Sequence, residues 1–141
     1  NSGIRALVIA PTRELAEQIH NAFETLGQKT RLRSVAVYGG VGINPQIQKL
    51  RRADIVVACP GRLLDHIGRR TADLRNLEVL VLDEADHMFD MGFFPDIRRI
   101  FLSVPQSRQT LLFFATMPAA IRRLANDVLR DPITVEIGTS V

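Results

Sequence analysis

The sequence predicts an α/β fold with a parallel sheet flanked by helices on both faces, and three observations lead to this prediction. Short apolar runs recur along the chain, at residues 4–10, 34–38, 54–58, 79–82 and 110–114. A segment with apolar residues at helical spacing follows each run. The run 79–82 is entirely aliphatic, which is typical of a strand buried on both faces. A strand–helix–strand order implies parallel neighbouring strands joined by right-handed crossovers.

Length and composition fit a single domain. A chain of 141 residues can bury a core, and its 46% hydrophobic and 23% charged residues are ordinary for a soluble globular protein. No apolar run approaches the ~20 residues that cross a bilayer, and no signal-peptide pattern is present, so we expect no membrane partner. Cys59 is the only cysteine, which fits a reducing compartment, and we expect a cytoplasmic protein.

The cations are almost all arginine. The formal net charge is +3, and among 18 basic residues only Lys29 and Lys49 are lysines. Guanidinium groups bind phosphates in a fork and stack on bases, so this composition is compatible with nucleic acid. High-GC codon usage gives the same bias. The Arg-Arg pairs at 51–52, 69–70, 98–99 and 122–123 lie on predicted helices and are interpreted as solvated faces.

Three carboxylates, Asp83, Glu84 and Asp86, directly follow the apolar run 79–82. Charged groups are not left unpaired in an apolar interior, so the strand must deliver them to its carboxyl end. In open α/β sheets that end faces the ligand crevice. An Asp there can hold a hydrated Mg²⁺ on a nucleotide phosphate, and a neighbouring Glu can orient and deprotonate a water. The alternative, acids at the start of a helix, explains one or two carboxylates but not three.

Two predicted helices carry a cation in the first turn, where it is unfavourable. Arg13 follows Thr12, the expected N-cap of a helix that stops at Gly27. Arg62 likewise lies in the first turn of the helix that opens at Pro60. A cation opposes the helix dipole at this end, but a bound anion would be held by the free backbone N–H groups and the guanidinium together.

The remaining segments complete the expected order of elements. A short helix at 44–52 is predicted to be capped by Asn44, and further helices are expected at 86–92, 97–104 and 118–129. Alternating apolar and polar residues at 133–137 predict an edge strand. Gly39 and Gly40, taken by themselves, indicate a tight turn.

In a parallel sheet every loop that follows a strand emerges at the same edge, and the unusual residues all lie on such loops. These residues are Pro11, Thr12, Arg13, Gly39, Gly40, Pro60, Gly61, Arg62, Asp83, Glu84, Asp86, Ala115 and Thr116. Arginines lie on the earlier loops and carboxylates on a later one. This arrangement suits two neighbouring phosphate systems, a nucleic-acid backbone and a metal-bound nucleotide.

The same residues carry a resemblance to a known family. The tetrad Asp-Glu-Ala-Asp at 83–86 resembles the signature of the DEAD-box RNA helicases, and Pro-Thr-Arg-Glu-Leu-Ala at 11–16 resembles motif Ia. The Gly-Gly doublet, Pro-Gly-Arg at 60–62 and Ala-Thr at 115–116 are similar to the GG motif, motif Ib and motif III. The resemblance runs from residue 4 to about residue 137. It implies that 1–141 is part of the first RecA-like domain of an ATP-dependent RNA helicase, truncated at its N-terminus.

The resemblance also implies roles and cofactors. Asp83 would hold the Mg²⁺ of ATP through water, and Glu84 would activate the attacking water, so both are expected to be catalytic and to face the cofactor. Asp86, Ala115 and Thr116 would couple the ATP site to RNA. The RNA backbone would be held, independently of sequence, by Pro11, Thr12, Arg13, Gly39, Gly40, Pro60, Gly61 and Arg62. The expected partners are RNA and a second RecA-like domain of the same protein.

The chain departs from the family pattern in two residues and lacks two motifs. Cys59 replaces a Thr, and a thiol is a poor N-cap; Phe114 replaces a Ser of motif III, which puts the coupling of ATP turnover to strand separation in doubt. The sequence contains no Gly-x-x-x-x-Gly-Lys-Ser/Thr phosphate loop and no Q motif. We therefore expect negligible ATP hydrolysis by this chain alone, and self-association through a sheet edge exposed by the missing strand.

Two other functions remain open. A non-catalytic RNA-binding or regulatory module would share the arginines but give the tetrad no chemical task; a phosphate loop encoded just upstream of Asn1 would favour the enzyme. A phospho-acceptor receiver domain is also α/β with an Asp that ends a central strand. It needs further acids after the first strand and a Lys after the last, where this chain has Thr12 and Arg13 and no Lys beyond Lys49.

Overall fold

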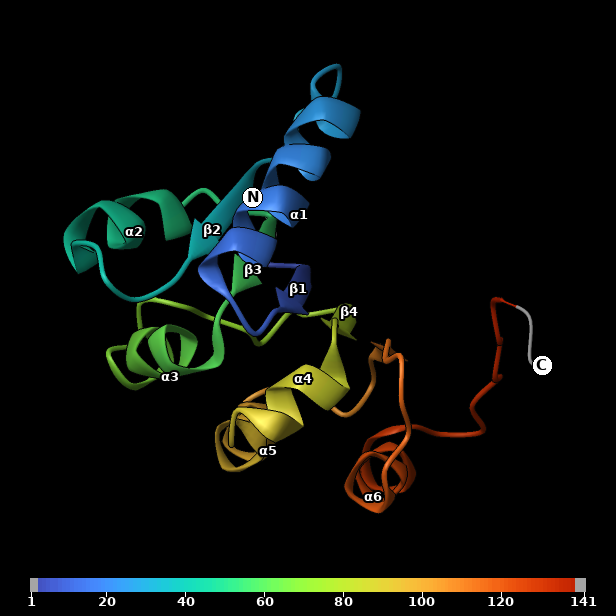
Figure 1. Cartoon of the computed structure of the whole chain (residues 1–141). Coiled ribbons are helices and arrows are strands. Elements are labelled where there is room, and N and C mark those ends of the chain that lie inside the picture. Colours follow the sequence, from blue (N-terminus) through green and yellow to red (C-terminus); the bar gives the residue numbers. More distant parts are fainter. Residues whose placement is uncertain (1–2, 139–141) are drawn as a thin grey trace.

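The computed structural model, which describes residues 3–138, is built on a parallel sheet (Figure 1). Its strands are β1 (Ala6–Ile9), β2 (Ser34–Val37), β3 (Ile55–Ala58), β4 (Val79–Leu82) and β5 (Gln109–Leu112). They are ordered β2-β3-β1-β4-β5, and every pair is parallel. The predicted parallel α/β sheet is therefore confirmed, with β1 at its centre and β4 beside it.

Each strand is followed by one or two helices, as the apolar spacing predicts. They are α1 (Arg13–Gly27), α2 (Ile43–Leu50), α3 (Pro60–Gly68), α4 (Ala85–Asp90), α5 (Phe94–Phe101) and α6 (Ala119–Val128). Helix α4 stops where Gly92 takes a positive φ of 78°, a conformation that glycine adopts without steric cost. None of the described helices is both long and apolar enough to cross a bilayer.

Helices cover the two faces of the sheet unequally. The larger core packs alternate strand residues against side chains of five helices, namely Leu50 (α2), Leu63 (α3), Met88 (α4), Ile97 (α5) and Leu124 (α6). On the other face α1 packs Ala16 against Val8 and Val57, and Figure 1 shows α1 on the opposite side of the sheet from α3 and α5. In β4, Leu80 and Leu82 are buried, whereas Val79 and Val81 are half-buried. The expectation that this strand is buried on both faces is thus right for one face only.

The predicted cap of the second helix is wrong. Helix α2 begins at Ile43 with Gly42 as its N-cap, and no side chain caps it. Asn44 therefore lies inside the first turn and is exposed. The N–H groups of the first helical turn have no acceptor within the helix, so the N–H that Pro45 lacks is not needed there. The helix can therefore begin before Pro45.

The strand predicted at 133–137 is absent from the structure. These residues lead away from the sheet (Figure 1), and Ile133 and Ile137 are 91% and 96% exposed. Alternating hydrophobicity describes a strand only when another strand lies alongside, and none of the described strands pairs with this segment.

Candidate functional site

The loops that follow the strands gather at the carboxyl edge of the sheet. Backbone hydrogen bonds continue past the strand ends and hold these loops in register: Ala10 N donates to Ala58 O, Cys59 N to Val37 O, and Asp83 N to Ile9 O, each at 2.9 Å. The carboxylates after β4 and the arginines at the starts of α1 and α3 thus lie on one side of the fold. The strand order predicts this shared edge, and the structure has it.

Asp83 and Glu84 form the acidic turn between β4 and α4. Asp83 is half-buried, and its Oδ1 accepts a hydrogen bond of 2.9 Å from Glu84 N. Burial raises the pKa of Asp83, the Glu84 charge raises it further, and the bond from Glu84 N only partly offsets this. Glu84 is exposed and has left-handed backbone angles, φ 50° and ψ 53°, which are strained for a residue with a side chain. Such strain is common at functional sites, where the surrounding fold imposes it.

Asp86 joins the acidic turn to the loop after β5. Its Oδ2 accepts three hydrogen bonds, from Ala115 N at 3.2 Å and from Thr116 N and Thr116 Oγ1 at 3.0 Å each. Burial acts to raise the pKa of Asp86, but the bonds from Thr116 and Ala115 together outweigh it and hold the pKa below its usual value. This contact between the tetrad and the Ala-Thr pair agrees with what the family resemblance implies. Phe114 is half-buried and has no hydroxyl to add to it.

Arg13 lies at the exposed start of α1 over an aromatic ring. Its guanidinium carbon is 4.9 Å from the centre of the Tyr38 ring, a cation–π contact. The hydroxyl of Tyr38 donates a hydrogen bond to Glu17, which raises the pKa of Tyr38, with burial adding to the shift. Tyr38 therefore packs against one face of the Arg13 guanidinium.

The two helix starts that carry arginines differ in their caps. Thr12 Oγ1 accepts a hydrogen bond of 3.1 Å from Leu15 N, so the predicted cap of α1 is present. Cys59 occupies the equivalent position before α3 and caps no N–H with its side chain. Burial raises the pKa of the Cys59 thiol, and the Glu14 charge adds to this. Pro11 and Pro60 are buried, so they can shape these loops but not offer their rings to a ligand.

The glycine loop after β2 is bound to the start of α3. Gly39 and Gly40 are exposed, and Gly40 has a φ of 80°, which a side chain would strain. Arg62 Nη2 donates to Val41 O and Arg62 Nη1 to Gln46 Oε1, each at 3.1 Å. The exposed Gly61 has open space where its Cβ would be, and the described protein itself does not fill it.

Comparisons with known proteins show the family to which this chain belongs. The family model described as DEAD/DEAH box helicase matches residues 1–124. The chain belongs to this family. It is 49% identical over 135 residues to the DEAD-box ATP-dependent RNA helicase CshA of Bacillus subtilis, and 48% identical over 136 residues to the ATP-dependent RNA helicase DBP3 of Phaeosphaeria nodorum. These matches cover 95% and 96% of the chain but only 27% and 23% of the relatives.

Solved DEAD-box structures share the fold. The crystal structure of a DEAD box protein from Methanococcus jannaschii superposes with a TM-score of 0.90 at 45% identity, and covers 93% of this chain and 36% of that one. A hypothetical ATP-dependent RNA helicase from Sulfolobus tokodaii gives 0.86 at 42% identity, with 92% and 39% covered. The RecA-like fold inferred from the resemblance is thereby confirmed. The chain spans about a quarter of the length of the curated relatives that it matches.

The acidic turn of this DEAD-box chain fits a magnesium ion that is held mainly by other groups. Mg²⁺ on a nucleotide takes one or two carboxylates and fills its octahedron with phosphate oxygens and waters. Asp83 and Glu84 offer such carboxylates, and no group of three or more metal-binding side chains exists among residues 3–138. This sequence contains no phosphate loop that could bind the phosphates of the nucleotide.

Sequence reasoning missed several residues that shape the site. The sequence pattern predicts Tyr38 only as the end of a strand, and Gln46 and His66 only as helix residues. Both Gln46 and His66 are buried, at 6% and 0% exposure. One signal was available: Gln46 precedes Leu50 by four residues, which places a polar side chain on the inward face of α2. Nothing in the spacing shows that this side chain reaches α3.

Proposed function

We propose that the chain is the part of an ATP-dependent RNA helicase that carries the acidic tetrad for ATP hydrolysis and part of the RNA-binding surface. The observation that supports this most is the arrangement of charges: carboxylates and arginines lie on separate loops of one sheet edge. Two adjacent phosphate ligands, ATP and an RNA backbone, would match it. The names of the curated relatives, ATP-dependent RNA helicases, agree with this proposal.

Asp83 and Glu84 would serve the ATP site. Asp83 would hold Mg²⁺ through water, and the ion, when bound, would neutralise charge on the phosphates. Glu84 is exposed, so its carboxylate can take a proton from an attacking water. Its strained backbone and the 3.1 Å contact with His87 Nδ1 would hold that carboxylate in place.

Asp86 and Thr116 would link ATP turnover to the RNA side. A shift of the acidic turn moves the acceptor of three hydrogen bonds, and the loop at 113–118 must follow or lose them. Ala115 contributes through its backbone N–H alone, so side-chain changes there matter less than at Thr116.

The arginine and glycine loops would bind RNA phosphates and sugars. Arg13 and Arg62 supply charge, and Gly40 and Gly61 leave space for close approach of a backbone. Thr12 accepts the cap bond and can still donate its hydroxyl proton, while Gly39 is exposed beside Gly40. Contacts of this kind carry no base information, so the predicted binding is independent of RNA sequence.

The experiment pairs RNA binding with ATP hydrolysis. We expect the 141-residue chain to bind a single-stranded RNA weakly and to hydrolyse no ATP with or without it, because no residue of this sequence forms a phosphate loop. Arg13→Ala should weaken RNA binding about tenfold and lower the salt slope of log K by about 0.7, the share of one phosphate contact on a single strand. Arg99→Ala, on the exposed face of α5, is the matched control and should leave both unchanged.

The outcomes separate the enzyme from its alternative. Steady RNA-stimulated ATP hydrolysis by this chain would contradict the expected dependence on a phosphate loop. Equal losses for Arg13→Ala and Arg99→Ala would contradict the RNA surface. A non-catalytic RNA-binding module, which would use the same arginines and give the tetrad no chemical task, is the second candidate function. The reading frame upstream of Asn1 decides between them, since a phosphate loop there supports the enzyme.

A further inference from the structure

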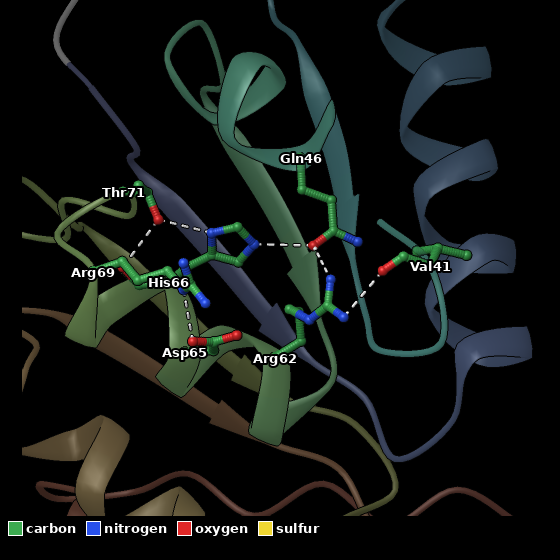
Figure 2. Close-up of polar contacts among 7 residues, drawn as sticks. All are labelled: Val41, Gln46, Arg62, Asp65, His66, Arg69 and Thr71. Atoms are coloured by element: carbon green, nitrogen blue, oxygen red, sulfur yellow. Dashed lines mark hydrogen bonds and ion pairs between the residues drawn. The ribbon is translucent and has the colours of Figure 1, made fainter. Parts of the chain in front are cut away.

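Gln46 and His66 are the buried polar side chains of the described core, and neither has a part in the function proposed above. They come from different helices, α2 and α3, and meet behind the glycine loop. Gln46 Oε1 accepts from His66 Nε2 at 2.9 Å and from Arg62 Nη1 at 3.1 Å. Figure 2 shows this oxygen between the imidazole and the guanidinium. One buried amide oxygen thus holds a residue of the proposed RNA surface.

The orientation of the Gln46 amide is fixed by the backbone of the glycine loop. Gln46 Nε2 donates to Tyr38 O at 2.9 Å, so the amide oxygen must point toward α3. His66 Nε2 therefore carries a proton. His66 Nδ1 lies 2.8 Å from Thr71 Oγ1, and the same hydroxyl also donates to His66 O at 3.1 Å. A flipped amide would place a donor against two donors, which the burial of Gln46 makes costly.

The same hydrogen bonds fix the plane of the Arg62 guanidinium. Nη1 is tied to Gln46 on α2 and Nη2 to Val41 O at the end of the glycine loop. Rotation about the partial double bond Nε–Cζ, which exchanges Nη1 and Nη2, must therefore break both hydrogen bonds. Its remaining N–H groups stay available, and a long side chain that is already ordered loses little conformational freedom when it binds a phosphate.

We infer that Gln46 is a positioning residue that presets the Arg62 guanidinium for an RNA phosphate, so that the glycine loop and the start of α3 act as one preformed contact. The inference rests on the proposed function only in assigning RNA to Arg62. Gln46 itself touches no ligand. Its effect on RNA affinity passes through Arg62, which makes the inference testable by combining substitutions.

The first test measures the guanidinium directly and needs no RNA. The Nη protons of Arg62 are observed in ¹⁵N–¹H spectra and assigned by their loss in Arg62→Ala. They should give separate signals in the wild type and one averaged signal in Gln46→Met. This substitution keeps the side-chain length but loses the amide oxygen. Gln48→Met, exposed on the same helix, is the control and should leave them resolved. Resolved Arg62 signals in Gln46→Met would overturn the inference.

A second variant covers the case in which Gln46→Met does not fold. Gln46→Glu keeps an acceptor for Arg62 and His66 but loses the donor to Tyr38 O. The Arg62 signals should then stay resolved, because the oxygen that orders the guanidinium is still present. Averaged Arg62 signals in a folded Gln46→Glu protein would contradict the inference as directly.

The third test is a double-mutant cycle on RNA affinity with a labelled oligouridine. Gln46→Met should weaken binding about three- to tenfold in the wild type, the range of one lost hydrogen bond, and by less than twofold when Arg62→Ala is already present. Equal losses in both backgrounds would overturn the inference. If Arg62→Ala alone leaves the RNA affinity unchanged, Arg62 does not bind RNA, and the inference that Gln46 presets it for an RNA phosphate is wrong as well. Guanidinium signals that are resolved in the wild type and averaged in Gln46→Met would still show that Gln46 orders Arg62.

Discussion

Thr12 and Cys59 are two residues in equivalent places, each just before a helix at the carboxyl edge of the sheet. Thr12 satisfies Leu15 N, but the Cys59 side chain caps none of the first N–H groups of α3. Both helices bring an arginine in the first turn, where the dipole opposes it. The start of α3 therefore lacks the side-chain cap that α1 has, although its arginine, Arg62, is hydrogen-bonded to two other segments.

A hydroxyl at position 59 should strengthen this start. Cys59→Thr should raise the free energy of unfolding by about 0.5–1 kcal/mol, because its oxygen can accept from the exposed first turn as Thr12 does in α1. Urea unfolding followed by circular dichroism measures the change. Thr12→Ala should cost about 1 kcal/mol in the same assay. Cys59→Ala is the control for losing the thiol, and a gain from it equal to that of Cys59→Thr would show that capping is not the cause.

At the scale of elements, the strands and their carboxyl edge could be predicted from sequence because both depend on local pattern. The aliphatic run 79–82 followed by acids can end only at a solvent-facing edge, and the parallel order places Arg13 and Arg62 there too. What could not be predicted depends on distant partners. Gln46 faces inward by its spacing, but its partner His66 is set by how α2 and α3 pack.

The errors have the same physical origin. Alternation at 133–137 is a property of the segment, whereas a strand needs a neighbour. Asn44 is a good cap by residue type, yet the N-cap of α2 is Gly42, two residues earlier, because Pro45 is tolerated inside the first turn. The Asp86 contact with Thr116 could be predicted only through family resemblance, since the two residues come from different strand ends.

The buried pair between α2 and α3 also predicts a pH dependence of stability. Burial lowers the pKa of His66, and the nearby Arg62 charge lowers it further; Asp65 acts in the opposite direction, and Arg69 adds to the lowering. The unfolded chain takes up this proton near pH 6.5, before the folded protein does. Stability is therefore full above that pH and falls as the pH drops toward the lower folded-state pKa, with a slope of at most about 1.4 kcal/mol per pH unit for one proton.

The measurement is urea unfolding between pH 7.5 and pH 5. His66→Gln removes the titrating group and should flatten the loss in this interval, even though it lowers stability at pH 7.5. His87→Gln, at an exposed position on α4, should leave the slope as it is in the wild type. A loss of stability below pH 6.5 that is equally steep in His66→Gln would show that other groups carry it.

At the scale of the whole molecule, the sheet has one well-covered face, one sparsely covered face and two edges. In the described chain β5 pairs only with β4, and its residues are half-buried or exposed. Phe113 beyond it is 51% exposed, and the segment at 132–135 lies along a hollow shared with Phe101, Leu112 and Val128. A parallel strand with unpaired N–H and C=O groups on its outer side is a template for another chain.

We therefore expect the 141-residue chain to self-associate through the β5 edge. Sedimentation velocity over a hundredfold range of concentration should show dimers or larger species that grow with concentration. Leu111→Lys places a charge on this edge, on the face that α1 leaves partly open, and should shift the protein toward monomer without unfolding it. Leu102→Lys adds the same charge at a position that is 88% exposed and lies off the sheet, and should not. A wild-type chain that stays monomeric at every concentration would contradict the exposed edge as an association site. If both lysine substitutions reduce association equally, the added charge is the cause and not its place on β5.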